Sequence, residues 1–200
     1  MLINTVTPSE FPLQEVEYIQ SSWTQYIDTW FIPSNTSKVQ VSMWWFTIVW
    51  TWWVLFWARY AWASNWRWFL ISYNNGNSSY QFGWTYSSVL PTWWTSWDHT
   101  LEISQTWVYI DWNLASTPST VTFTSPVSMT IFCDNDNWTK NEYSSYKLYT
   151  FKIWDNWTLV RDFVPSYRKS DNVIWLYDIV NDKFYTNAGS WTFTKWPDVN

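Results

Sequence analysis

Oxygen-bearing side chains gather in one short segment, Asp134-Asn135-Asp136-Asn137. Carboxylate and amide oxygens are the ligands that Ca²⁺ takes in proteins, so Asp134 and Asp136 are the candidate metal ligands of this chain. The spacing does not fit an EF-hand loop, because the fifth position is Trp138 and no Glu closes the segment. The alternative is a plain hairpin turn, which an Asp- and Asn-rich segment also favours. Calcium is therefore the one cofactor that the sequence raises, and it competes with a simple turn.

Three side chains that could contact a sugar stand on successive apolar runs: Arg59, Tyr73 and Tyr80. The runs resemble neighbouring strands, so the three residues are predicted to share one face of a sheet. Tyr rings and the Arg guanidinium stack on flat surfaces, and sugar rings offer such surfaces. The alternative is that all three take part in ordinary packing of the sheet.

Tryptophan stands at many positions where a turn favours glycine. The chain has 23 Trp and 3 Gly among 200 residues, whereas Gly makes up roughly 7% of an average sequence, or about fourteen residues here. Many Trp follow Asn, Asp or Ser between apolar runs, where a hairpin often needs φ > 0 and prefers Gly. Tryptophans in such contexts are Trp23, Trp66, Trp97, Trp112, Trp138, Trp157 and Trp191, and the pairs at 44–45, 52–53 and 93–94 resemble Gly-Gly loops.

We hypothesise that most of these Trp residues are Gly in the natural protein. The codon UGA specifies Trp in one common variant of the genetic code and Gly in certain uncultured bacterial lineages, so translation with the wrong table would produce this substitution. Gly from ordinary codons would survive, as three do. The alternative is a truly Trp-rich protein, with Trp in sugar grooves or at a membrane interface. Trp68 and Trp154 lie inside strand-like runs and are expected to be genuine.

Short runs rich in Val, Ile, Thr, Tyr and Phe, separated by turn residues, predict an all-β fold. No window shows a sustained 3.6-residue apolar period. We expect a two-sheet antiparallel jelly-roll sandwich over residues 14–196, preceded by a lead-in or linker at 1–13 and followed by a tail at 197–200. The predicted strands are Glu15–Gln20, Gln25–Asp28, Ser37–Met43, Val54–Tyr60, Trp68–Tyr73, Ser79–Phe82, His99–Ser104, Trp107–Ile110, Ser119–Phe123, Met129–Cys133, Ser145–Trp154, Leu159–Val164, Val173–Asp178 and Lys183–Thr186.

Three blocks carry a resemblance to a known family. They are Lys152–Trp191 near the C-terminus, with its Ile174-Trp175-Leu176-Tyr177-Asp178 motif, the opening segment Glu17–Trp30, and the central segment Asp98–Trp112. Together they resemble the LamG-like, concanavalin A-like jelly-roll domains of gut bacterial surface proteins and their phages. The resemblance covers about residues 15–195 and implies the same fold. The family has Gly where this chain has Trp23, Trp30, Trp157, Trp175 and Trp191.

No catalytic site is expected. Glycoside hydrolysis needs two carboxyl groups that flank the bond, and catalytic jelly-roll relatives place Glu-x-Asp-x-Glu on one strand. None of the five Glu of this chain stands in that pattern. The one His, His99, follows Asp98, but no Ser stands in a recognisable nucleophile context. His99 is therefore expected to be a structural residue at the start of a strand.

The charge pattern narrows the possible partners. A net charge of −5 with scattered Lys and Arg argues against nucleic acid, and charged residues interrupt the apolar stretch 43–68, which argues against membrane insertion. We expect a non-catalytic module of a bacterial surface or phage protein that binds carbohydrate or another surface ligand, outside the cell or on a virion. The alternative is a structural spacer or assembly domain of a phage tail or virion appendage, within a larger assembly, and a glycoside hydrolase is a distant third.

Overall fold

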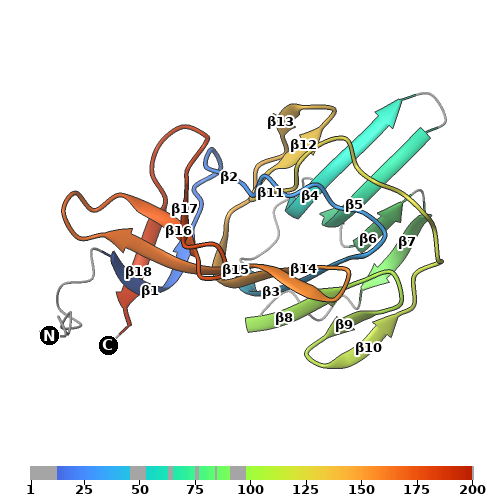
Figure 1. Cartoon of the computed structure of the whole chain (residues 1–200), viewed down its shortest axis with the longest axis horizontal. Coiled ribbons are helices and arrows are strands. Elements are labelled where there is room, and N and C mark those ends of the chain that lie inside the picture. The colour runs from blue at the N-terminus through green and yellow to red at the C-terminus, as the bar shows by residue number, and fades with distance from the viewer. Residues whose placement is uncertain are drawn as a thin grey trace, which may run out of the picture.

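The computed structural model describes residues 13–45, 53–62, 65–74, 77–83, 85–90 and 98–199. All regular structure in these ranges is β, and the strands form two sheets that pack face to face (Figure 1). The predicted all-β jelly-roll sandwich is therefore confirmed.

One sheet has ten strands and is antiparallel throughout. Its strands are β1 (Leu13–Gln20), β3 (Ser37–Trp45), β8 (Asp98–Ile103), β9 (Val108–Ile110), β10 (Asn113–Ser116), β14 (Tyr146–Asp155), β15 (Thr158–Arg168), β16 (Ile174–Asp178), β17 (Lys183–Thr186) and β18 (Thr194–Asp198). They follow the order β10-β9-β8-β3-β14-β1-β15-β16-β17, and β18 pairs with β1.

The other sheet has eight strands. They are β2 (Ile27–Asp28), β4 (Trp53–Trp62), β5 (Asn65–Asn74), β6 (Asn77–Gly83), β7 (Thr85–Leu90), β11 (Thr130–Ile131), β12 (Asp134–Asp136) and β13 (Thr139–Asn141). The main order is β13-β12-β4-β5-β6-β7, and β11 joins β2 to β4. One pair, β12 with β4, is parallel, so this sheet is mixed, whereas its other strand pairs are antiparallel as predicted.

Alternating side chains from both sheets meet in the core. Val39 and Val41 of β3 and Phe151 of β14 face Phe56 of β4 and Phe69 of β5, and all five are fully buried. The rings of Phe56 and Phe151 meet edge to face across the two layers, with centroids 5.5 Å apart. The inward alternation that the sequence shows in each strand therefore produces one continuous apolar core.

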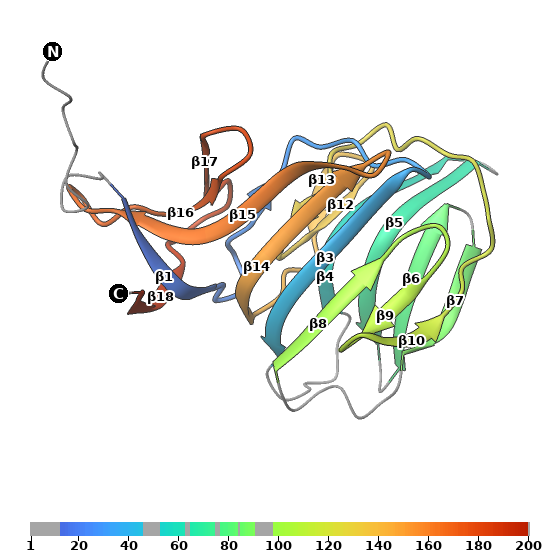
Figure 2. The ribbon, with the colours of Figure 1, turned by 60° about the horizontal axis from the view of Figure 1, so that its bottom comes forward.

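The C-terminal strands continue beyond the sandwich. In Figure 2, β15, β16 and β17 project past the eight-stranded sheet together with β1 and β18. The two described chain ends lie side by side there, since Val16 pairs with Asp198 and the Val199 N–H donates to the Glu15 carbonyl at 3.0 Å. The two described ends therefore lie close together, and β18 reaches into the segment 197–200 that was expected to be a tail.

One strand predicted from apolar alternation, Ser119–Phe123, does not form. The structure gives it no strand, and only the following residue, Thr124, forms an isolated bridge. Its apolar side chains are buried by packing instead of pairing: the Phe123 ring lies 5.1 Å from that of Phe82, and Val121 lies over Gly83. Conversely, β7, β10, β12, β13 and β18 were not predicted, because they are short or lack an apolar run.

Some segments that were expected to be loops belong to strands. Trp44 and Trp45 end β3 and pair with Lys147 and Tyr146, and Trp66 lies in β5 opposite Ala61. Trp53 begins β4 and pairs with Tyr73. The prediction of Gly-type loops or turns is therefore wrong at these four tryptophans. Trp68 and Trp154 lie within β5 and β14, as predicted. Trp52, Trp93, Trp94 and Trp97 lie outside the described residues.

Candidate functional site

The outer face of the eight-stranded sheet, the face turned away from the core, has chemistry of its own. Along β4 and β5 the core face carries Phe56 and Phe69, and the alternate positions carry Trp57, Arg59 and Trp68. Trp57, Trp68, Val54 and Leu70 form a second, separate apolar cluster. Arg59 lies directly opposite Trp68 in the strand register, and its guanidinium lies 5.2 Å from that ring.

A chain reversal brings acidic side chains to Arg59. β11 runs antiparallel to β4, and then the chain turns back at Phe132, whose φ is +73°. β12 consequently runs parallel to β4 and places Asp136 opposite Arg59. An Arg59 guanidinium nitrogen lies 3.3 Å from a carboxylate oxygen of Asp136. The predicted sugar-contacting Arg59 and the predicted metal ligand Asp136 are therefore parts of one site.

The pKa values of two further carboxyl groups depend on the same charged side chains. Burial, and then the nearby Asp136 and Glu142 carboxylates, raise the pKa of Asp134 from 3.8 to about 8, although Arg59 and Lys140 oppose the shift. Burial also raises the pKa of Glu142, with Arg59 opposing and Asp136 adding to the shift. We call Arg59, Trp68, Asp134, Asp136 and Glu142 the Arg59 cluster.

Several polar atoms of this cluster are buried and have no hydrogen-bond partner in the described structure: Arg59 Nε, Asp134 Oδ1, Asp136 Oδ1 and Glu142 Oε2. Buried polar atoms are nearly always paired, because an unpaired one costs about 1–3 kcal/mol. The side chains are nevertheless within reach of solvent, since Arg59 is 30% and Asp136 24% exposed, whereas Asp134 is almost fully buried. The cluster thus combines unsatisfied donors and acceptors with partial access from outside.

Tyr80, another predicted contact residue, does not join Arg59 in this way. Tyr80 pairs with Ile71 on the core face, is 1% exposed, and its hydroxyl lies 2.9 Å from the Ser116 hydroxyl. The prediction that Tyr80 shares a face with Arg59 is wrong, because the two stand on opposite sides of the sheet. Tyr73 lies in β5 opposite Ser78, and its side chain lies outside the described residues.

A calcium site finds no support at Asp134 and Asp136. Over residues 13–45, 53–62, 65–74, 77–83, 85–90 and 98–199, no three His, Cys, Asp or Glu side chains are placed to hold one metal ion. The Arg59 guanidinium already supplies a positive charge to Asp136. The segment does form the hairpin considered as the alternative, since β12 and β13 pair antiparallel around a turn at Asn137 and Trp138.

His99 is held as a structural residue. Its Nδ1 lies 2.7 Å from an Asp111 carboxylate oxygen, and the other oxygen of Asp111 accepts the Thr100 backbone N–H at 2.9 Å. The adjacent Asp98 instead accepts the hydroxyl of Tyr149. A hollow of about 280 Å³ adjoins these groups. The His99–Asp111 contact ties the β9–β10 turn to the start of β8, so the carboxylate partner is one that sequence adjacency did not indicate.

Comparisons with known proteins were made for the whole chain. Neither the family models nor the curated proteins give a match. Within the described ranges, no helix is long and apolar enough to cross a membrane.

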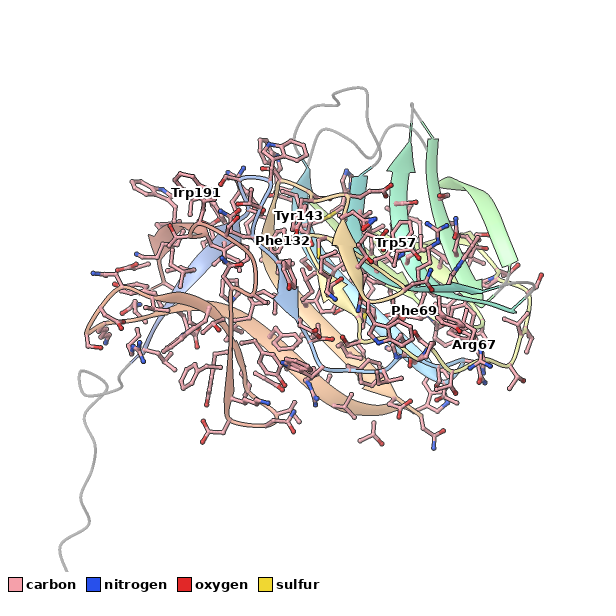
Figure 3. The ribbon with its side chains drawn as sticks, turned by 90° about the horizontal axis from the view of Figure 1, so that it is seen from above. Trp57, Arg67, Phe69, Phe132, Tyr143 and Trp191 are labelled. Atoms are coloured by element: carbon pink, nitrogen blue, oxygen red, sulfur yellow. The ribbon has the colours of Figure 1, made fainter. Side chains whose placement is uncertain are left out.

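Figure 3 shows Trp57 of β4 and Arg67 of β5 on one side of the molecule and Trp191 on the other side. The outer face of β12, β4 and β5 is therefore a site separate from the projecting C-terminal strands.

Proposed function

We propose that the domain is a non-catalytic module that binds a glycan or a similar polyhydroxylated surface ligand through the Arg59 cluster. The observation that carries the proposal is the set of unpaired donors and acceptors beside an aromatic ring in a partly exposed cluster. The same proposal assigns the domain to the surface of a bacterium or a virion, in line with the LamG-like resemblance.

Sugar hydroxyls match the exposed polar groups of the cluster chemically. Each hydroxyl both donates and accepts a hydrogen bond, so neighbouring hydroxyls can bind the partly exposed Arg59 guanidinium and Asp136 carboxylate together. The Trp68 ring is buried beside Arg59, so it supports the guanidinium and is not itself a stacking surface for the sugar. Binding should be weak at one site and should strengthen when several copies are displayed together.

Binding without cleavage is favoured by the burial of Asp134. A glycosidase needs two carboxyl groups that reach either side of the scissile bond. Asp134, whose raised pKa would suit an acid, is 1% exposed, and Asp136 is held by Arg59. The arrangement therefore supports recognition better than hydrolysis.

The test compares retention of the purified domain on an array of neutral and acidic polysaccharides with that of the variant Arg59→Met. Arg59→Met keeps an apolar stem on β4 but removes the donor and the charge, and we expect retention on the glycan bound by the parent to fall about tenfold, the loss of roughly one charged hydrogen bond. Glu142→Gln keeps Arg59 in place and should weaken retention less.

The matched control is Lys38→Met on the outer face of the ten-stranded sheet. Lys38 has the same type of surroundings as Arg59, with Glu102 at 3.4 Å and the Trp154 ring at 3.9 Å. The Lys38→Met variant should be retained on the glycan as well as the parent is. Equal retention by the parent and by a folded Arg59→Met variant would refute the site. If the parent binds no glycan and self-associates instead, the structural spacer takes the place of this proposal.

A further inference from the structure

Six tryptophans have a left-handed backbone. Their φ angles are +82° at Trp23, +53° at Trp30, +66° at Trp112, +69° at Trp138, +67° at Trp157 and +64° at Trp191. This region places the side chain of an L-residue against its own backbone, and among ordinary residues mainly Gly, Asn and Asp occupy it. An indole at six such positions in one domain needs a local cause.

Three of the six occupy the same place in the same kind of turn. Asp111-Trp112 joins β9 to β10, Asn137-Trp138 joins β12 to β13, and Asn156-Trp157 joins β14 to β15. Both residues of each pair have positive φ, near +47° and then +67°. Two central residues with positive φ define the type I′ hairpin turn, whose preferred pairs are Asn-Gly and Asp-Gly. The first residue of each pair, Asp or Asn, is the type that this turn prefers. Only the second residue departs from the preference, because it is Trp in place of Gly.

Burial of the indole does not explain the choice of Trp. All six side chains are exposed, from 42% at Trp23 to 81% at Trp191. Trp138 and Trp157 do contact another ring, Tyr60 and Trp107, with centroids 5.8 and 5.6 Å apart. Phe132 provides the contrast, since its φ is also positive but its ring is fully buried and stacks on Tyr146 at 4.4 Å.

We propose that glycine occupies positions 23, 30, 112, 138, 157 and 191 in the protein as its source makes it, through UGA codons that the source reads as Gly. The composition points the same way, with 23 Trp and 3 Gly. Tryptophans inside strands, such as Trp68 and Trp154, are outside this set, because a strand backbone accepts an indole readily.

The first test is the codon at each of the six positions, together with the mass of the corresponding peptides from the source. UGA codons and the lighter, Gly-containing peptides are expected. UGG codons, or peptides that contain Trp, would overturn the proposal.

The second test measures the folding equilibrium of three recombinant chains: the printed sequence, a chain with Gly at all six positions, and a chain with Ala at all six. Gly removes the strain that a Cβ causes at positive φ, whereas Ala removes the indole but keeps the Cβ. The six-glycine chain should have the highest melting temperature, with the folded-to-unfolded ratio raised roughly fivefold at each position. If the printed chain aggregates, restoring one Trp at a time in the six-glycine chain gives the same comparison. Equal stability of the Gly and Ala chains would contradict the backbone argument.

Discussion

The surroundings of Asp134 oppose its charge. It is almost fully buried, one of its carboxyl oxygens has no partner, and its neighbours Asp136 and Glu142 are acidic. Arg59 and Lys140 do not offset the burial and the two neighbouring carboxylates, so the fold favours the protonated form of Asp134. A buried neutral acid of this kind makes the stability of the domain depend on pH.

Stability should fall as the pH rises between about 4 and about 8, because the folded-state pKa of Asp134, about 8, lies above the ordinary value of 3.8. The slope should reach at most about 1.4 kcal/mol per pH unit. Asp134→Asn removes the titrating group, so the variant should be more stable than the parent at pH 8 and similar to it at pH 4. Urea unfolding at both pH values measures this difference.

Asp171→Asn is the control of opposite sign. The Arg168 guanidinium hydrogen-bonds to Asp171 and lowers the pKa of that carboxyl. The fold therefore favours the charged form of Asp171, and the variant should lose stability at neutral pH. A gain in stability for both variants, or for neither, would refute the assignment of the buried charge to Asp134.

The chain reversal between β11 and β12 determines where the Arg59 cluster forms. Phe132 takes a left-handed backbone there, accepts the Ser144 N–H at 2.8 Å, and packs its ring against Tyr146 and Phe193. A left-handed backbone costs an ordinary residue about 1–2 kcal/mol, whereas removing a buried Phe ring costs about 3–5 kcal/mol. Packing therefore outweighs backbone strain at this position, unlike at the exposed turn tryptophans.

Phe132→Gly should destabilise the domain by about 2–3 kcal/mol, since the lost ring outweighs the relieved backbone. Trp157→Gly, at a similar φ but with an exposed ring, should stabilise it by about 1 kcal/mol. Chemical denaturation of both variants gives the two changes in the free energy of unfolding. Changes of the same sign would show that burial does not decide between these sites.

The whole molecule brings its two described ends together on neighbouring strands. β1 and β18 pair from Val16 with Asp198 to Gln20 with Thr194. The Arg59 cluster lies instead on the sandwich, on β4 and β12.

Joining the ends should preserve the fold. A circular permutant that links residue 199 to residue 13 with a short flexible segment, and opens in the exposed turn at Asn156 and Trp157, breaks no core contact. We expect a β-rich circular dichroism spectrum and a melting temperature within a few degrees of the parent. A permutant opened inside β14 at Phe151, which is fully buried, should fail to fold. Similar melting of the two permutants would contradict the described strand order.

The amino-acid sequence alone determined the fold class and most of the strands of the sandwich. Inward alternation of apolar residues with a period of two is a local property, so β3, β8, β14 and β15 could be predicted from their own residues. The left-handed turns at Trp112, Trp138 and Trp157 were predictable for the same reason, because Asp or Asn before the position specifies the turn.

Only the tertiary structure decided which side chains meet. Arg59 and Asp136 are far apart along the chain, and neither residue type nor spacing indicates that β12 runs parallel to β4. The reversal at Phe132 depends on a buried ring stack with Tyr146, which no local pattern encodes. The same dependence placed Tyr80 in the core and left Val121 and Phe123 packed without a strand, because burial by distant neighbours and not local alternation determines where an apolar side chain is accommodated.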